Sequence, residues 1–290
     1  MMATSNRTAM RQDPYYTEPA DVKWAELSIL GTYGDRVSAA EKAKCLHKFG
    51  ANIAVGASFE TIADFLSTEG NETFVSTNII DSIVSSNAGD TQTITVEGHT
   101  IDVSGNLTFV VQNATLTGQT EVTLTTPLAR CVRMYVANSG TFDSPQAALA
   151  GEVVVYDNTD GITAGAPNTA AAGKCLIKAG ATQSEKCATS ISSVDYWLLT
   201  TFDAHIGDAG GSAAYVTVRI EIRDVANGGV WRPLGNDIVL AVGSTSPPTV
   251  EFKPYLIVPK NHDIRARAKC DANSASVTAE ISGYLAKVVG

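Results

Sequence analysis

The stretch YVTVRIEIR, residues 215–223, decides the fold class because its side chains alternate strictly between apolar and polar. Branched aliphatic residues occupy every second position from Val216 to Ile222, and threonine, arginine or glutamate fills the positions between them. Successive side chains of a β-strand point to opposite faces, so one face meets a core and the other meets water or a neighbour. The pattern predicts a half-buried antiparallel strand.

The same period of two recurs on both sides of this stretch. Residues 91–126, TQTITVEGHTIDVSGNLTFVVQNATLTGQTEVTLTT, alternate in the same way and have glycines in the breaks. Similar short runs continue to SGYLAKVVG, residues 282–290, and turn-forming pairs such as Asp160-Gly161 separate them. No sequence pattern typical of a crossover helix lies between these runs, which favours antiparallel connections between the strands. The sequence therefore predicts a mainly β protein with an antiparallel β-sandwich, jelly-roll-like body.

Residues 35–70 carry a different pattern, which predicts a short helical segment. Ser38 with Glu41 three places later is a capping-box signature, and Gly50 stands where the residue after a helix C-terminus would lie. The stretch ASFETIADFLS, residues 57–67, spaces its apolar residues onto one helical face and predicts a further turn or two.

The N-terminal residues form an expected extended arm. They are polar, and Pro14 and Pro19 keep the chain extended and prevent a helix from running through them. Small residues without periodicity at 161–173 mark a minor boundary further along the chain. We therefore expect four regions: an arm at 1–34, a helical anchoring segment at 35–70, a first β region at 71–160, and a second β region at 161–290 that completes the sandwich.

Composition excludes several classes of protein. The chain has 290 residues, of which 44% are apolar and 18% charged, and its formal net charge is −9. Binding to phosphate backbones needs clustered lysine and arginine, so nucleic acid is not an expected partner. No apolar run of about 18 residues is present, and the N-terminus lacks the apolar core of a signal peptide, so no membrane contact is expected.

The cysteines and histidines follow no familiar metal or redox pattern. The five cysteines are scattered and include no C-x-x-C pair, and the four histidines include no H-x-H or H-E-x-x-H. Cys175 and Cys187 are spaced so that they could pair across a hairpin, but we expect small buried thiols. The sequence predicts no cofactor and no metal.

The densest polar cluster is DAHIGD, residues 203–208. In a strand, Asp203 and His205 share a face, and Asp208 lies nearby in the sequence. A hydrolytic enzyme can use such a pair, with the histidine as the base and the carboxylate to orient it. However, the chain contains no G-x-S-x-G elbow and no identifiable nucleophile, so we interpret the cluster as the surface of a strand end. NHDIRAR, residues 261–267, is interpreted likewise as a loop tip followed by a strand with Arg265 and Arg267 facing water. We expect no enzyme.

Four short motifs lie between residues 48 and 98. Their residues are Lys48, Phe49, Gly50 and Asn52; Ser58, Glu60, Thr61 and Ile62; Ser85, Ser86, Asp90 and Thr91; and Val96 with Gly98. These motifs resemble segments of a family of tailed-bacteriophage virion structural proteins, which are encoded among head and tail genes. Ala63 departs from the pattern, because relatives often have tryptophan there. The resemblance implies a virion structural protein and brings no catalytic residue with it.

With this resemblance, the sequence favours a homo-oligomeric subunit, expected to be a trimer, in the neck or tail of a phage particle. Its location is then the virion, after synthesis in the host cytoplasm, and its further partners are portal, adaptor, tail or capsid proteins. Apolar residues that an arm cannot bury by itself gain stability on a neighbouring molecule. The expected anchoring residues are Tyr15, Tyr16, Trp24, Leu27, Ile29, Leu30, Phe49, Phe59 and Ile62.

Three alternatives remain open on the sequence alone. The chain could decorate the capsid or form a head fibre. It could bind a host receptor or carbohydrate at a tail tip, with Tyr156, Trp231 and Arg232 stacking on sugars. It could also hydrolyse the cell envelope through Asp203, His205 and Asp208.

Overall fold

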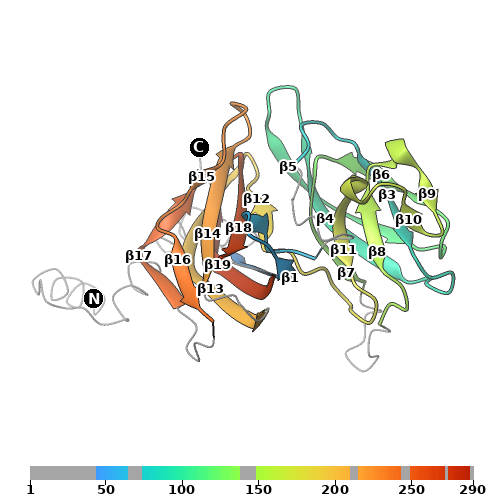
Figure 1. Ribbon diagram of the computed structural model, residues 1–290. Helices are drawn as coiled ribbons and strands as arrows, with labels where there is room; N and C mark the ends of the chain where they lie inside the picture. The colour runs from blue at the N-terminus through green and yellow to red at the C-terminus, as the bar shows by residue number, and fades with distance from the viewer. Residues whose placement is uncertain are drawn as a thin grey trace, which may run out of the picture.

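The computed structural model of the protein describes residues 44–64, 74–137, 148–209, 215–242, 249–271 and 274–287. These residues form two β lobes that lie side by side (Figure 1). The frame lobe comprises residues 44–64 and 187–287, so the described chain begins and ends in it. The insert lobe comprises residues 74–186.

The frame lobe is a sandwich of two sheets whose strand pairs are all antiparallel, as the alternating pattern predicts. Sheet A has the order β1-β19-β13-β17, and sheet B has the order β12-β18-β14-β15, with β16 beside β14 and β2 beside β18. Inward side chains of both sheets, including Trp197, Phe202 and Ile264, form its core. The strands are β1 (Lys44–Val55), β2 (Glu60–Thr61), β12 (Ala188–Ser190), β13 (Asp195–Ala209), β14 (Tyr215–Asp224), β15 (Arg232–Pro233), β16 (Ile238–Ala241), β17 (Thr249–Val258), β18 (His262–Cys270) and β19 (Ala275–Lys287).

The insert lobe has its own core between sheet C, ordered β11-β8-β3-β6, and sheet D, ordered β5-β4-β7. Its helical elements, within the residues described, are two 3₁₀ turns, Asn158–Asp160 and Ala170–Ala172. No helix in the described ranges has the length and apolarity needed to cross a membrane. The strands are β3 (Ile80–Ser85), β4 (Thr93–Ile101), β5 (Leu107–Thr115), β6 (Val122–Leu128), β7 (Arg130–Val136), β8 (Val153–Tyr156), β9 (Ile162–Thr163), β10 (Ala166–Pro167) and β11 (Gly173–Ile177).

The chain leaves the frame lobe and returns to it through two segments that are paired with each other. The amide of Asp64 donates to the carbonyl of Glu185 at 2.9 Å, and the amide of Cys187 donates to the carbonyl of Ile62 at 2.9 Å. Ala63 forms a β-bridge with Lys186 between these two bonds. We call this paired crossing, residues 62–64 and 185–187, the stem.

The helix expected within residues 38–50 is wrong for its described part, because Lys44–Val55 is β1. Ten residue pairs join β1 to β19, and this ladder outweighs the local helical pattern. Gly50 is not the end of a helix. A Cβ atom there would lie 2.4 Å from the Cys187 nitrogen and 2.4 Å from the Ile62 oxygen, so glycine lets the stem cross β1 closely. Residues 57–64 are not helical either and contain the short strand β2.

The expected division at residues 160 and 161 also differs from the structure. Strand β11 lies after that boundary, yet it pairs with β8 in sheet C of the insert lobe. The chain returns to the frame lobe only at the stem. In addition, β1 and β2, from the expected anchoring segment, are strands of the frame lobe. The expected arm, residues 1–34, lies outside the described residues.

Candidate functional site

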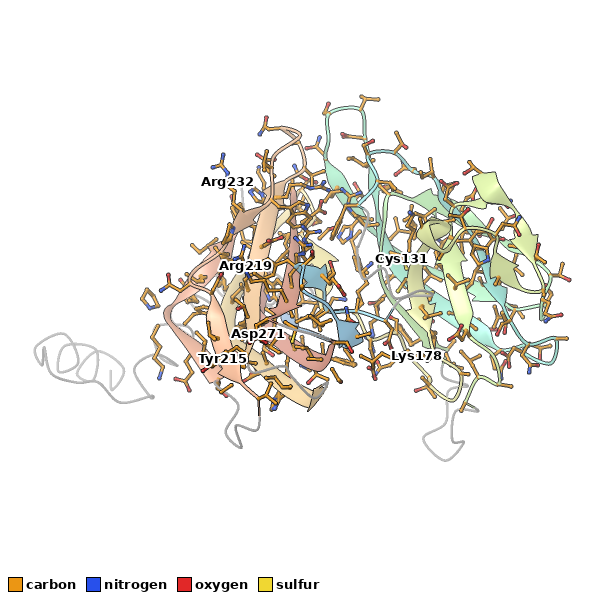
Figure 2. All side chains as sticks on the ribbon, viewed as in Figure 1. Cys131, Lys178, Tyr215, Arg219, Arg232 and Asp271 are labelled. Atoms are coloured by element: carbon orange, nitrogen blue, oxygen red, sulfur yellow. The ribbon has the colours of Figure 1, made fainter. Side chains whose placement is uncertain are left out.

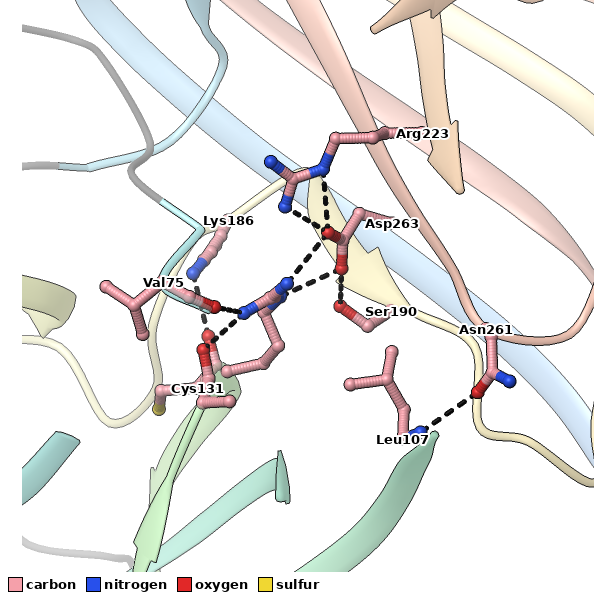
Figure 3. Close-up of polar contacts among 10 residues, drawn as sticks. Val75, Leu107, Cys131, Lys186, Ser190, Arg223, Asn261 and Asp263 are labelled. Atoms are coloured by element: carbon pink, nitrogen blue, oxygen red, sulfur yellow. Dashed lines mark hydrogen bonds and ion pairs between the residues drawn. The ribbon is translucent and has the colours of Figure 1, made fainter. Parts of the chain in front are cut away.

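Asp263, the second residue of β18, is the centre of a charged network at the junction of the two lobes (Figure 3). Arg130, at the start of β7 in the insert lobe, donates from Nε to Asp263 Oδ1 at 2.9 Å and from Nη2 to Oδ2 at 3.0 Å. Arg223 of β14 donates to Oδ2 at 2.5 Å, and the Ser190 hydroxyl donates to Oδ1 at 2.5 Å. Two arginines from different lobes therefore share one carboxylate.

This network is buried. Asp263 is 0% exposed and Arg130 is 3% exposed. Arg130 also donates from Nη1 to the carbonyls of Val75 and Ala129, so each of its three nitrogens makes a hydrogen bond. Burial alone would raise the pKa of Asp263, but the charges of Arg130 and Arg223 and the hydrogen bonds hold it below its ordinary value.

We expect this junction to make the protein less stable in acid. The folded-state pKa of Asp263 lies below the unfolded value of about 3.9, so between the two values the folded chain binds fewer protons. Its stabilisation is complete above the unfolded pKa and is lost as the pH falls through the folded pKa. Thermal unfolding midpoints measured from about pH 7 to about pH 2 should fall more steeply for the wild type than for Asp263→Asn. If the unfolding midpoints of the two proteins fell equally steeply with decreasing pH, the assignment of this acid sensitivity to Asp263 would be contradicted.

Two lysines extend the junction along β7. Lys48 of β1 donates to the Val132 carbonyl at 2.9 Å, and Lys186 of the stem donates to the Cys131 carbonyl at 2.7 Å. Burial lowers the pKa of Lys48 to about 8, against the opposing charge of Glu97. These ammonium groups donate to carbonyl oxygens of β7, so they fix the insert lobe by backbone contacts that do not depend on its side chains.

The far end of the junction is joined by an asparagine. Asn261 lies before β18, and its Oδ1 accepts from the Leu107 amide at 2.9 Å, while its Nδ2 donates to Asn106 Oδ1 at 3.1 Å. His99 of β4 is buried and lies opposite Phe109 in sheet D, with the two rings 5.3 Å apart in an edge-to-face arrangement. Burial lowers its pKa to about 3, so His99 is neutral at ordinary pH.

Aromatic rings cover the arginines on the outer face of sheet B. Arg265 lies 3.9 Å from the ring centre of Trp231, and Arg219 lies 3.7 Å from that of Phe59. Glu221 accepts from Arg265 at 2.9 Å. Such stacked guanidinium groups are both paired and shielded from water. The expectation that Arg265 faces water is therefore wrong, since it is 7% exposed.

A charged side chain of the insert lobe also contacts the stem. Figure 2 shows Arg219 and Arg232 in the frame lobe, and Cys131 and Lys178 in the insert lobe. Lys178 reaches across to the stem, where its Nζ lies 2.5 Å from Asp64 Oδ1. The polar groups of the junction thus hold one another and fix the two lobes in one orientation.

The structure describes three of the anchoring residues expected from the sequence, and these three lie in different surroundings. Ile62 is 0% exposed and belongs to the frame-lobe core. Phe59 is half-buried beneath Arg219, and Phe49 is half-buried on the outer face of sheet A, 5.7 Å from the ring of His47. The remaining expected anchors lie outside the described residues: Tyr15, Tyr16, Trp24, Leu27, Ile29 and Leu30.

The residues of the alternative hypotheses are also separated. Asp203 and His205 share the outer face of sheet A, as the strand pattern predicts, and the side chain of Asp208 lies outside the described residues. Tyr156 is 0% exposed and its hydroxyl donates to Glu121 at 2.7 Å, so its ring is not available to stack on a sugar. Trp231 stacks on arginines of its own chain.

The junction residues are the ones that sequence reasoning missed. Asp263 and Arg130 are separated by 133 positions, and no local spacing links them. The available signal is a charged residue inside an otherwise apolar strand, as in ARCVRMYV, residues 129–136. A charge in such a place needs a buried partner, although the pattern does not say which. In the described part of the chain, no three His, Cys, Asp or Glu side chains are arranged to hold a metal ion.

Comparisons with known proteins assign no family to the chain. No protein-family model and no curated protein matches the chain. The structure of the infectious bursal disease virus Gt strain is similar over 85% of this chain and 73% of that chain, with 10% identity and a TM-score of 0.23. The crystal structure of the infectious bursal disease virus VP2 subviral particle covers 87% and 79%, with 9% identity and a TM-score of 0.18. TM-scores this low leave the function to be argued from the chain's own residues.

Proposed function

We propose that this chain is a non-enzymatic structural subunit of a tailed-bacteriophage virion. It assembles as a homo-oligomer, a trimer, in the neck or tail, where its N-terminal arm anchors it to a neighbouring virion protein. Four motifs between residues 48 and 98 support the phage assignment by their resemblance to virion proteins. The subunit is made in the host cytoplasm and functions in the particle.

The observation that carries the proposal is the buried junction between the lobes. Asp263, Arg130 and Lys48 are charged or strongly polar groups of the kind that active sites use, yet each is engaged across the junction. Burying such groups costs desolvation energy, and in return it specifies one relative orientation of two lobes. A building block of a particle needs that rigidity, because small changes in lobe orientation would displace its contacts with neighbours.

A second observation concerns where the preceding chain joins this body. The 43 residues before Lys44 enter at β1, which lies at the edge of sheet A. They include aromatic and aliphatic residues between 15 and 30. Such a segment gains stability by burying these side chains on a partner during assembly. The arm therefore supports attachment, and the two lobes supply the body.

Deletion of residues 1–33 is expected to abolish incorporation into particles without unfolding the lobes. The cores of the described frame and insert lobes are built from residues between Leu46 and Leu285, so the deletion removes none of their described packing. The measurement is complementation of a phage that lacks the gene, followed by quantification of the subunit in purified particles. Thermal unfolding of the purified variant controls for folding, and normal incorporation of a folded deletion variant would contradict the anchoring role.

A reconstruction of the particle at side-chain resolution distinguishes the neck and tail from the capsid surface. Density for the two-lobed body on a neck or tail axis is the expected result. Density spread over the capsid surface would replace this placement with a decoration protein.

A further inference from the structure

The outer face of sheet A carries an apolar band that crosses all four strands. Cys45 of β1 is opposite Tyr284 of β19, Tyr284 is opposite Leu198 of β13, and Leu198 is opposite Ile257 of β17. Side chains directly opposite each other on one face lie within contact distance. Cys45 is exposed and Ile257 is 53% exposed, so the band is accessible at both edges of the sheet.

On one side of the band the next row of side chains is also apolar, and on the other side the next row is polar. One row beyond it, Tyr196 is opposite Ala286, and both are half-buried. On its other side, the next row holds His47, Ser282, Thr201 and Glu251. The row next to the band on this side is therefore polar, and Phe49 of β1 is a separate apolar side chain further along the same face. Contiguous exposed apolar side chains of this kind mark interaction surfaces.

This end of the sheet is also where the preceding chain arrives. Lys44 is the first residue of β1 and is adjacent to Cys45 in the band. Forty-three residues precede it, and their large apolar side chains are concentrated between positions 15 and 30. The band and the segment are both apolar, and they belong to the same end of the same sheet.

We propose that the band on sheet A receives the apolar arm segment, residues 15–30, of a second copy of this chain. This inference rests on the proposed homo-oligomeric assembly and deepens it by naming the surface that the arm contacts. The occupant is an extended segment whose tyrosine, tryptophan and leucine side chains cover Cys45, Leu198, Tyr284 and Ile257.

The length of the connecting chain favours a second copy. Residues 31–43 separate the apolar segment from β1. Extended chain spans at most about 3.3–3.6 Å per residue, so these 13 residues reach about 43–47 Å. Four strands spaced about 4.8 Å apart are only about 15 Å across. The spacer can thus carry the apolar segment well beyond the edges of its own sheet, as contact with a second copy requires.

Cys45 provides a natural reporter, because it is exposed while the other described cysteines are buried. The donor is the full chain with Leu27→Cys and Cys45→Ser, and the acceptor is the wild-type full chain. In a mixture, a disulfide between the introduced thiol and Cys45 can form only between two molecules. Oxidation under mild conditions followed by mass spectrometry is expected to identify this cross-link.

Two acceptor variants test the band itself. Ile257→Lys places a charge in the band, and Val239→Lys is its matched control because Val239 is 61% exposed on β16 of sheet B. The initial rate of cross-linking should fall about tenfold with Ile257→Lys and stay unchanged with Val239→Lys, which corresponds to a tenfold loss of affinity. Unfolding midpoints of both variants verify that they fold.

Three results would overturn the inference. The first is the absence of the cross-link, and the second is an equal rate with both acceptor variants. The third is a dominant Cys45–Cys45 cross-link between wild-type chains, which would mean that two sheet faces pack together. Light scattering separates this failure from that of the proposed function. If the chain is an oligomer but no cross-link forms, only the proposed binding surface of the arm is refuted. If the chain is a monomer at all concentrations, the proposed homo-oligomeric assembly is refuted as well.

Discussion

Replacing Asp263 with alanine should lower the free energy of unfolding by about 3–5 kcal/mol. The carboxylate is 0% exposed and accepts hydrogen bonds from Arg130, Arg223 and Ser190. Its removal leaves two guanidinium groups, one of them buried, without their counter-charge, and it disconnects the insert lobe from β18. Guanidinium chloride unfolding, monitored by tryptophan fluorescence, measures the loss.

The matched control is Asp237→Ala, which removes another aspartate paired with an arginine. Asp237 Oδ2 lies 2.5 Å from Arg219 Nη2, but its side chain is 36% exposed. Exposed ion pairs contribute about 0–1 kcal/mol, so this variant should unfold near the wild type. If the two variants lost similar amounts, the junction would not depend on the buried charge.

Replacing Trp197 with alanine is expected to cost about 3–5 kcal/mol by a different mechanism. Trp197 is 0% exposed and is among the largest fully buried side chains of the described residues. It lies in the hydrophobic core of the frame lobe, between sheets A and B. The loss comes from the removed apolar surface and from the cavity that remains, and chemical denaturation followed by circular dichroism measures it.

Trp197→Phe separates packing from hydrogen bonding. The indole nitrogen of Trp197 is buried and has no hydrogen-bond partner among the described residues. Phenylalanine keeps most of the ring and removes this nitrogen, so its cost should be clearly smaller than that of alanine. Equal costs for the two substitutions would show that the indole group has a polar role that the structure does not display.

The strand pattern of the sequence predicted the frame of the fold because it reports burial directly. In β14, Val216, Val218 and Ile220 are at most 3% exposed, as the alternation requires. The pattern was less informative about the opposite face, where Glu221 is 5% exposed and pairs with Arg265, which lies against the ring of Trp231. A polar side chain at an alternate position predicts the face it occupies, but what covers that face depends on distant residues.

Strand β1 shows why the N-terminal prediction failed. Lys48 and Asn52 point into the protein and make buried hydrogen bonds, so the strand lacks the apolar inner face that identifies a strand. Its sequence then resembles a short capped helix. The deciding contacts are with β19 and with the second half of the stem at Cys187, both more than a hundred positions away along the chain, and no local pattern contains them.

The candidate site was even less accessible from sequence. Arg130 and Asp263 occur in strands whose patterns are otherwise ordinary, and their pairing depends on the packing of one lobe on another. The apolar band on sheet A likewise consists of four residues from four strands. It becomes visible only when the register of those strands is known.

The stem has a consequence for how such a protein can change over evolutionary time. Both ends of the insert lobe meet at the stem, which is one short hydrogen-bonded crossing. The insert lobe could therefore be exchanged for another domain without changing the strand order of the frame lobe. We expect exchange to be constrained most strongly at the buried charges of the junction. A replacement lobe must present a cation to Asp263 and a hydrogen-bond acceptor to Lys48, or the frame lobe must lose those charged groups in the same step. Recombination between such genes is therefore limited to lobes that match these buried charges.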